Sequence, residues 1–340
     1  MLKETVLKSE PLLKVRDLKV HFPVEKGGLL RRRHALLKAV DGVSFNVMPG
    51  ETLGIVGESG CGKSTLGRAI LQLIPPTEGQ VLWYGQDLTA MDKTLLRAQR
   101  ESLQIIFQDP LASLNPRMTI GDIIAEPLRT FHPELDKQTV RDRVREMMAR
   151  VGLMPEMINR YPHEFSGGQC QRIGIARAMI LRPRLIICDE PVSALDVSIQ
   201  AQIINLLMAL QKEFGLSLIF ISHDLSVVRH ISHRVMVLYL GHIMELADKD
   251  SIYAAPKHPY TRALISAVPL PDPEAERNKQ VIELEGDLPS PINPPAGCVF
   301  RTRCPWEEPR CAEARPHLDA VADNHEVACL RWRELDQGAG

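Results

Sequence analysis

The stretch Gly57-Glu-Ser-Gly-Cys-Gly62-Lys63-Ser64 decides the fold, because it matches the pattern G-x-x-x-x-G-K-S at every defined position. An apolar run, Leu53–Val56, precedes it, and the run Thr65–Ile74 that follows has a helical pattern. Glycines let backbone N–H groups close around phosphate oxygens, and a helix N-terminus favours negative charge. The sequence therefore predicts a strand, loop and helix that together bind phosphate groups.

A second chemical motif lies well downstream, at the end of another apolar run. Leu185-Ile-Ile-Cys188 predicts a buried strand that delivers Asp189 and Glu190. In a nucleotide site, Asp189 is expected to hold Mg²⁺ through water, together with Ser64, and Glu190 to polarise the attacking water as general base. Lys63 is expected to reach the β- and γ-phosphates. The two motifs together predict a nucleotide and Mg²⁺ as ligands, and they leave kinases, GTPases and helicases open.

Strand and helix patterns alternate along most of the chain, which predicts a mostly parallel sheet. Between Thr119 and Leu181 the pattern is helical, as in an insertion within an α/β core. Further strands are expected at Leu12–Phe22, Leu103–Phe107 and Ser217–Ser222, and a helix near Val197–Phe214. Beyond Pro269 the chain becomes rich in proline, which predicts a linker or an irregular tail.

The composition excludes several classes of protein. Lys and Arg number 41 against 42 Asp and Glu, so the basic excess typical of a nucleic-acid-binding protein is missing, and we expect no nucleic-acid partner. No apolar run approaches the roughly 20 residues that cross a bilayer. The first ten residues lack the apolar core of an export signal. A role at a membrane would therefore require docking onto other subunits.

The segment Phe165-Ser166-Gly167-Gly168-Gln169 resembles the LSGGQ signature of ABC ATPases, with Phe in place of the usual Leu. The resemblance implies a P-loop NTPase fold, with a RecA-like core, an antiparallel β edge and a helical subdomain. It also implies that Ser166, Gly167, Gly168 and Gln169 meet the γ-phosphate bound by an opposing subunit. Two ATPase subunits would then face each other head to tail with two ATP molecules between them.

Other landmarks of this family fall in the expected order. Gln108 resembles the Q-loop glutamine that senses Mg²⁺ and contacts the membrane subunit, and His223 resembles the switch histidine. Ser193-Ala-Leu-Asp196 resembles the D-loop, which places Asp196 at the subunit interface. Phe22 stands where the family has an aromatic residue stacked on adenine. The ATP-binding residues implied are Gly57, Glu58, Ser59, Gly60, Cys61, Gly62, Lys63, Ser64, Thr65 and Phe22, with Glu190, His223, Gln108 and Lys63 as the catalytic set.

Three further segments narrow the resemblance to the ATPases of oligopeptide and dipeptide permeases. They are residues 108–117 (QDPLASLNPR), residues 190–198 (EPVSALDVS) and His258-Pro-Tyr-Thr261, and the pattern looks most similar to the F subunit of a dipeptide permease. The resemblance implies a sister ATPase, two transmembrane permease subunits, an extracytoplasmic binding protein, and a peripheral place on the cytoplasmic face of the cell membrane. Nickel chelates, opines and glutathione are alternative cargoes, and a non-transport ABC ATPase is a more distant alternative.

The resemblance also divides the chain. Residues 1–118 and 183–250 would form the ATP-binding core, residues 119–182 the helical subdomain with the signature, and residues 251–340 a small C-terminal extension. Without an export signal, cysteines are expected to act as thiols or metal ligands rather than disulfides.

Four cysteines of this extension, Cys298, Cys304, Cys311 and Cys329, are spaced C-x5-C-x6-C-x17-C. Four thiolates suit either Zn²⁺ or a cubane iron–sulfur cluster. The resemblance to permease ATPases implies a [4Fe–4S] cluster, with Zn²⁺ or free thiols as alternatives. Cys61, Cys170 and Cys188 need no ligand role.

Overall fold

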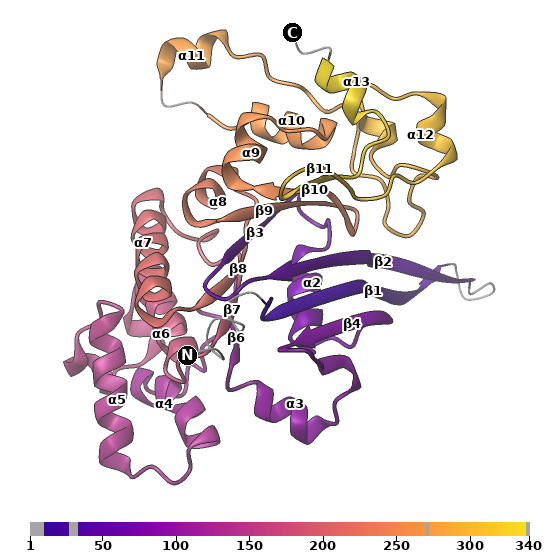
Figure 1. Ribbon diagram of the computed structural model, residues 1–340. Coiled ribbons are helices and arrows are strands. Elements are labelled where there is room, and N and C mark those ends of the chain that lie inside the picture. Colours follow the sequence, from indigo (N-terminus) through magenta and orange to yellow (C-terminus); the bar gives the residue numbers. More distant parts are fainter. Residues whose placement is uncertain (1–9, 27–32, 270–271, 338–340) are drawn as a thin grey trace. The chain divides into compact units, whose positions relative to one another are not determined.

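The computed structural model describes residues 10–26, 33–269 and 272–337 (Figure 1). The chain divides into two compact units, and each combines segments that are distant in the sequence. The first unit consists of Val47–Thr52, Ala90–Ser222 and the described residues up to Pro11. The second unit consists of Leu12–Asn46, Leu53–Thr89 and the described residues from His223 onward.

Three parallel strands form the core of the first unit: β6 (Leu103–Ile106), β7 (Leu185–Asp189) and β8 (Ser217–Ile221). β7 lies between the other two, with Leu103 opposite Leu185 and Leu185 opposite Ser217. Every residue of β7 and β8 is buried, as expected for apolar runs in a parallel sheet covered on both faces. The three strands end at one edge, so the residues that follow them gather there.

Helices account for most of the rest of the first unit: α3 (Lys93–Gln99), α4 (Ile120–Phe131), α5 (Lys137–Arg150), α6 (Gly167–Met179) and α7 (Val197–Phe214), with 3-10 turns at Pro155–Asn159 and Pro162–Glu164. Thr119, Asp136 and Ser166 cap α4, α5 and α6, since each side chain accepts a hydrogen bond from a free backbone N–H of the first turn. α4 packs against both α5 and α6. The segment from Thr119 to Leu181 is thus helical, as its pattern predicted.

In the second unit, β3 (Thr52–Val56) pairs in parallel with β9 (Arg234–Tyr239), and β10 (His242–Asp248) pairs with β9 in antiparallel fashion. A separate sheet has the order β2–β1–β4–β5, formed by Arg33–Val47, Leu13–Lys26, Glu78–Trp83 and Gln86–Asp87. β1 and β4 run antiparallel, which confirms the expected antiparallel edge.

The helices of the second unit are short: α2 (Lys63–Ile70), α8 (Leu225–Ile231), α9 (Lys249–Ala254), α10 (Pro259–Ser266), α11 (Pro273–Asn278), α12 (Pro309–Glu313) and α13 (Trp332–Gln337). Further 3-10 turns lie at Leu88–Ala90 and Arg301–Arg303. Among the described residues, no helix combines the length and the apolar character needed to cross a membrane.

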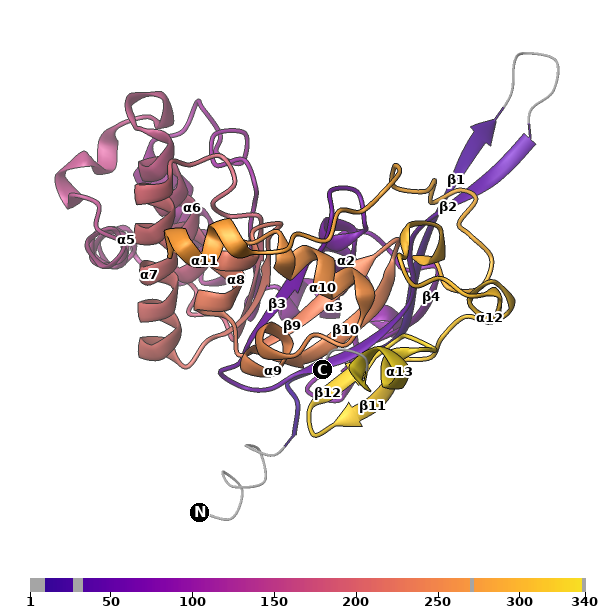
Figure 2. The same cartoon turned by 90° about the horizontal axis from the view of Figure 1, so that it is seen from above.

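The C-terminal segment is more ordered than the sequence predicted. β11 (Asp319–Ala322) and β12 (His325–Val327) form an antiparallel hairpin, and β12 pairs with β10 (Figure 2). The sequence predicted a linker or an irregular tail beyond Pro269 and missed this hairpin, because strands of three and four residues carry almost no periodic signal. The hairpin joins the end of the chain to the sheet that contains β3.

A buried carboxylate fastens this end of the chain to the sheet. Glu245 on β10 is fully buried, and its two oxygens accept hydrogen bonds from the backbone N–H groups of Lys257 (2.7 Å) and His258 (2.9 Å). The Nε2 atom of His325, on β12, lies 2.7 Å from the same carboxylate. Glu245 therefore links three segments that are separated by up to 80 positions.

Replacing this carboxylate tests how strongly it holds the tail. We expect Glu245→Ala to lower the free energy of unfolding by about 3–5 kcal/mol, because the buried N–H groups and His325 lose their partner. Urea denaturation followed by circular dichroism measures the change. Glu326→Ala, on β12 next to His325 and only half-buried, is the matched control and should change stability by less than about 1 kcal/mol. Equal losses in the two variants would contradict the anchoring role.

Candidate functional site

The phosphate loop of the second unit runs from the end of β3 into α2, as the motif predicted. Lys63, the first residue of α2, is buried, and its Nζ donates hydrogen bonds to the carbonyl oxygens of Gly57 (2.7 Å) and Glu58 (3.0 Å). The ammonium group of Lys63, at the end of the phosphate loop, therefore bonds to the first two residues of that loop. Ser64 and Thr65 lie half-buried in the first turn of α2, and Ser59 and Gly60 are exposed.

Two glycines of the loop are required because other backbone segments lie against them. A Cβ on Gly57 would overlap the carbonyl oxygen of Leu238 in β9, and a Cβ on Gly62 would overlap that of Ala39 in β2. Gly62 also has φ +106°, a conformation that disfavours side chains. Gly60 has φ +79°, but an added Cβ there would meet nothing within 4 Å. Close packing against other backbone segments therefore requires glycine at positions 57 and 62, whereas at Gly60 only the backbone conformation favours it.

Predicted catalytic residues of the first unit gather where its strands end. Asp189 is the last residue of β7 and is buried, and Glu190 follows it. Gln108, two residues beyond β6, donates a hydrogen bond from Nε2 to the Glu190 carboxylate at 3.1 Å. Glu190 has φ +47°, an uncommon backbone conformation for a residue with a side chain, and its N–H donates to Ile221 O at 3.0 Å. The turn after β7 thus holds the carboxylate in a defined direction.

The signature segment forms the start of α6 in the first unit. Ser166 is its N-cap residue, Ser166 N donates to Gln169 Oε1 (3.0 Å), and Gln169 N donates to Ser166 Oγ (3.4 Å). This reciprocal pair is a capping box. Ser166 and Gly167 are exposed at the helix start. An exposed serine and glycine at a helix N-terminus suit contact with an anion from outside this unit.

The remaining predicted residues are divided between the two units. Asp196 is exposed at the start of α7, and His223 is exposed directly after the first unit ends. Phe22 lies half-buried on β1 in the second unit. The structure therefore divides the predicted set between the units, with the phosphate loop, Phe22 and His223 in the second and Gln108, Asp189, Glu190, the signature and Asp196 in the first.

The four cysteines of the tail line one small cavity in the second unit, together with His258, Phe300 and Trp306. Burial raises the pKa of Cys298, that of Cys304 to about 12 and that of Cys329 to about 11. Within the described residues, no three acidic, His or Cys side chains are arranged as a ready metal-ligand group. The residues fit a metal in donor type and number, and a bound cation would favour the thiolates that burial disfavours.

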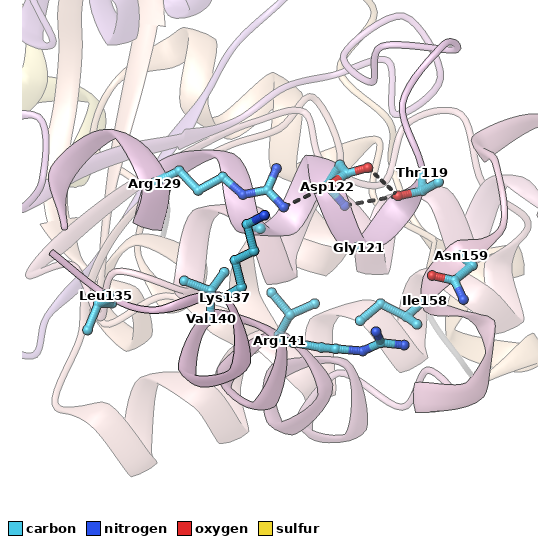
Figure 3. Close-up of a pocket in the computed structure, with 12 residues that line it drawn as sticks. Thr119, Gly121, Asp122, Arg129, Leu135, Lys137, Val140, Arg141, Ile158 and Asn159 are labelled. Atoms are coloured by element: carbon cyan, nitrogen blue, oxygen red, sulfur yellow. Dashed lines mark hydrogen bonds and ion pairs between the residues drawn. The ribbon is translucent and has the colours of Figure 1, made fainter. Parts of the chain in front are cut away.

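A second cavity, of about 500 Å³, lies between α4, α5 and the turn Pro155–Asn159 in the first unit (Figure 3). Its rim carries Arg129, Lys137 and Arg141, and Asp122 bonds both Thr119 and Arg129. This lining, drawn from residues 119–159, contains none of the predicted ATP-site residues.

Sequence reasoning did not find two side chains that touch the phosphate loop. Tyr260 Oη accepts a hydrogen bond from Glu58 N at 2.9 Å, and Arg303 Nη1 donates to Glu58 Oε2 at 2.7 Å. Both come from segments more than 200 positions downstream, where no spacing rule applies. The segment His258-Pro-Tyr-Thr261 resembles one found in permease ATPases, but its pattern does not predict a bond between Tyr260 and Glu58.

Comparison with known proteins gives the same assignment along most of the chain. The family model described as "ABC transporter" matches residues 40–193, and the model described as "Oligopeptide/dipeptide transporter, C-terminal region" matches residues 244–311. The oligopeptide transport ATP-binding protein OppF of Salmonella typhimurium is 64% identical over 321 residues, covering 94% of this chain and 96% of the relative. The chain belongs to the ATP-binding subunits of ABC transporters.

Other relatives agree. The oligopeptide transport ATP-binding protein AppF of Bacillus subtilis is 56% identical over 326 residues, which is 96% of this chain and 98% of the relative. Among solved structures, the ATP-binding cassette MJ0796 in a dimeric post-hydrolysis state with ADP and Pi has a TM-score of 0.62 at 29% identity, over 70% of this chain and 98% of that one. The predicted P-loop fold and the resemblance to permease ATPases are confirmed, and the chain is an ABC-type ATPase. Membership of the family implies permease partners.

The glycine packing gives a prediction for nucleotide binding. We expect Gly62→Ala to weaken Mg·ATP binding by at least about a hundredfold, since the added methyl group displaces the loop from Ala39. Gly60→Ala is the control: it adds backbone strain but no clash, and should cost about fivefold or less. Titration with a fluorescent ATP analogue measures both. Comparable losses in the two variants would show that strain, and not the close approach of the backbone, sets the requirement.

Proposed function

We propose that this ATPase energises the uptake of di- and oligopeptides. The observation that carries the proposal is the 64% identity with an oligopeptide transport protein along nearly the whole chain. The match of residues 244–311 to the C-terminal region of oligopeptide and dipeptide transporters supports it, because this region lies outside the common ATPase core. Nickel chelates, opines or glutathione are the alternative cargoes, and the same ATPase role would serve them.

We propose the division of roles that the sequence motifs of the family imply. Lys63 and the loop Gly57–Thr65 would bind the phosphates, with Phe22 at the adenine. Ser64, Asp189 and Gln108 would hold Mg²⁺, which would offset phosphate charge. Glu190 accepts the proton of the attacking water, in the orientation that its turn and the bond from Gln108 give it. His223 contacts the γ-phosphate. Ser166, Gly167, Gly168 and Gln169 act on the ATP of the partner, and Asp196 lies at that interface.

The proposed assembly contains a sister ABC ATPase, two transmembrane permease subunits and an extracytoplasmic substrate-binding protein, with this chain on the cytoplasmic face of the cell membrane. Residues 1–118 and 183–250 would form the ATP-binding core, residues 119–182 the helical subdomain, and residues 251–340 the C-terminal extension. Closure of the ATPase pair on ATP would change the access of the permease pair, and hydrolysis would reopen it.

The role of Glu190 is tested by Glu190→Gln. We expect this variant to bind Mg·ATP within about threefold of the native affinity and to hydrolyse it at least about a hundredfold more slowly, because the general base is lost. Phosphate release at saturating ATP gives the rate. Glu146→Gln, at an exposed position on α5 with an ion pair to Arg150, is the matched control and should retain full turnover. Near-native turnover in Glu190→Gln would refute its assignment.

The cargo is tested in cells whose chromosomal copy carries either the native sequence or Glu190→Gln. We expect uptake of labelled di- and oligopeptides to fall to background in the variant, since closure without hydrolysis stops the cycle. The Glu146→Gln strain should take up peptide normally. Unchanged peptide uptake, in a variant whose purified protein has lost phosphate release, would count against peptides as the cargo and favour nickel chelates, opines or glutathione.

We further propose that Cys298, Cys304, Cys311 and Cys329 hold a [4Fe–4S] cluster, with Zn²⁺ as the alternative. The support is that all four line one cavity. A cluster would supply covalent ties to a tail whose own apolar core is small. Anaerobically purified protein should contain about four iron and four sulfide per chain, and Cys311→Ala should lose most of it, whereas Cys170→Ala should not. Stoichiometric zinc without iron would exclude the cluster.

A further inference from the structure

Two side chains of the C-terminal segment contact the phosphate loop at Glu58. Arg303 Nη1 bonds its carboxylate at 2.7 Å, and Tyr260 Oη accepts its backbone N–H at 2.9 Å. All three residues belong to the second unit. Glu58 occupies one of the undefined positions of the motif, so its identity is not demanded by phosphate binding itself.

The side chains of Arg303 and Tyr260 that contact Glu58 are largely buried, and the ring of Tyr260 packs against other aromatic rings. The Arg303 side chain is 9% exposed and that of Glu58 28%, so the ion pair is less screened than a surface pair. Tyr260 is fully buried. Its ring packs edge-on against Tyr239 with centroids 4.8 Å apart, and it packs at a tilt against Phe300 with centroids 5.2 Å apart. Arg303 follows Phe300 by three residues, in the 3-10 turn Arg301–Arg303. One aromatic cluster thus supports both contacts.

Glu58 is also hydrogen-bonded to Lys63, the lysine of the phosphate motif. Lys63 Nζ donates to the carbonyl oxygen of Glu58 at 3.0 Å, while the N–H of the same residue donates to Tyr260. Movement of Glu58 would therefore shift one of the two carbonyl groups that accept hydrogen bonds from Lys63 Nζ. The Glu58 carboxylate also places a negative charge on a loop that receives phosphates, and Arg303 is the cation that offsets this charge.

We propose that Arg303 and Tyr260 are positioning residues of the nucleotide site, which make the affinity of the phosphate loop for Mg·ATP depend on the C-terminal segment. Arg303 neutralises Glu58, and Tyr260 fixes its backbone. The proposal rests on ATP binding by the loop and is independent of the transported cargo. It gives this part of the chain a role in the ATPase site itself, separate from that of the cysteines.

The test is the dissociation constant of Mg·ATP, measured on the full-length chain with a fluorescent ATP analogue and ATP competition. We expect Arg303→Gln to weaken binding about three- to tenfold, because an uncompensated carboxylate then faces the phosphates. The double variant Glu58→Gln/Arg303→Gln keeps the backbone groups of the loop and removes that carboxylate, so it should recover most of the affinity that Arg303→Gln loses. Turnover at saturating ATP should remain within about twofold, since the residues that act on water are elsewhere.

Two further variants separate this role from general loosening of the tail. Arg301 lies in the same 3-10 turn as Arg303 and forms a 2.8 Å ion pair with Glu307. Arg301→Gln removes this ion pair and leaves the contacts with Glu58 in place, so the variant should bind Mg·ATP normally. Tyr260→Phe keeps the ring and removes only the acceptor for Glu58 N–H, and should weaken binding about threefold.

Native affinity in Arg303→Gln would overturn the proposal. So would a loss that Arg301→Gln shares and that the Glu58→Gln change does not rescue. Failure of the native chain itself to bind Mg·ATP would instead count against the ATPase assignment.

Discussion

Backbone groups that lie directly against the phosphate loop are the constraint on which the second unit depends. The carbonyl groups of Ala39 and Leu238 leave no room for side chains at Gly62 and Gly57. Between them, Gly241 donates its N–H to Cys61 O at 2.9 Å and accepts from Asp41 N at 2.9 Å. The turn after β9 therefore bonds both to the loop and to β2, so the loop is shaped by two sheets and not by its own sequence alone.

A different constraint acts in the first unit. Parallel strands end at a common edge, and the residues just beyond them are brought together without any need for long side chains. The bond between Gln108 and Glu190 is the direct result, although 82 positions separate them. The positive φ of Glu190 is the conformational cost of turning sharply from a buried strand, and such strain is often found where a side chain must point in one direction.

The sequence predicted the parts of the fold that strong local patterns define. β7 and α7 have the bounds that their patterns predicted, and the strand, loop and helix at Gly57–Ser64 follow a motif with little freedom. It did not predict β11 and β12, because three or four residues are too few for periodicity. Nor could it give the bonds of Tyr260 and Arg303 to Glu58, since contacts between distant segments depend on packing that no spacing encodes.

The pairing of β3 with β9 has a consequence for the order in which the protein is made. Leu53 lies opposite Arg234, so the ribosome delivers β3 about 180 residues before the strand that lies beside it, a delay of about 10–35 s at typical rates of synthesis. During that interval a nascent chain carries the whole G-x-x-x-x-G-K-S motif without the Leu238 carbonyl group or the Gly241 turn. The motif is therefore complete early in translation, whereas the backbone groups that shape its loop are synthesised about 180 residues later.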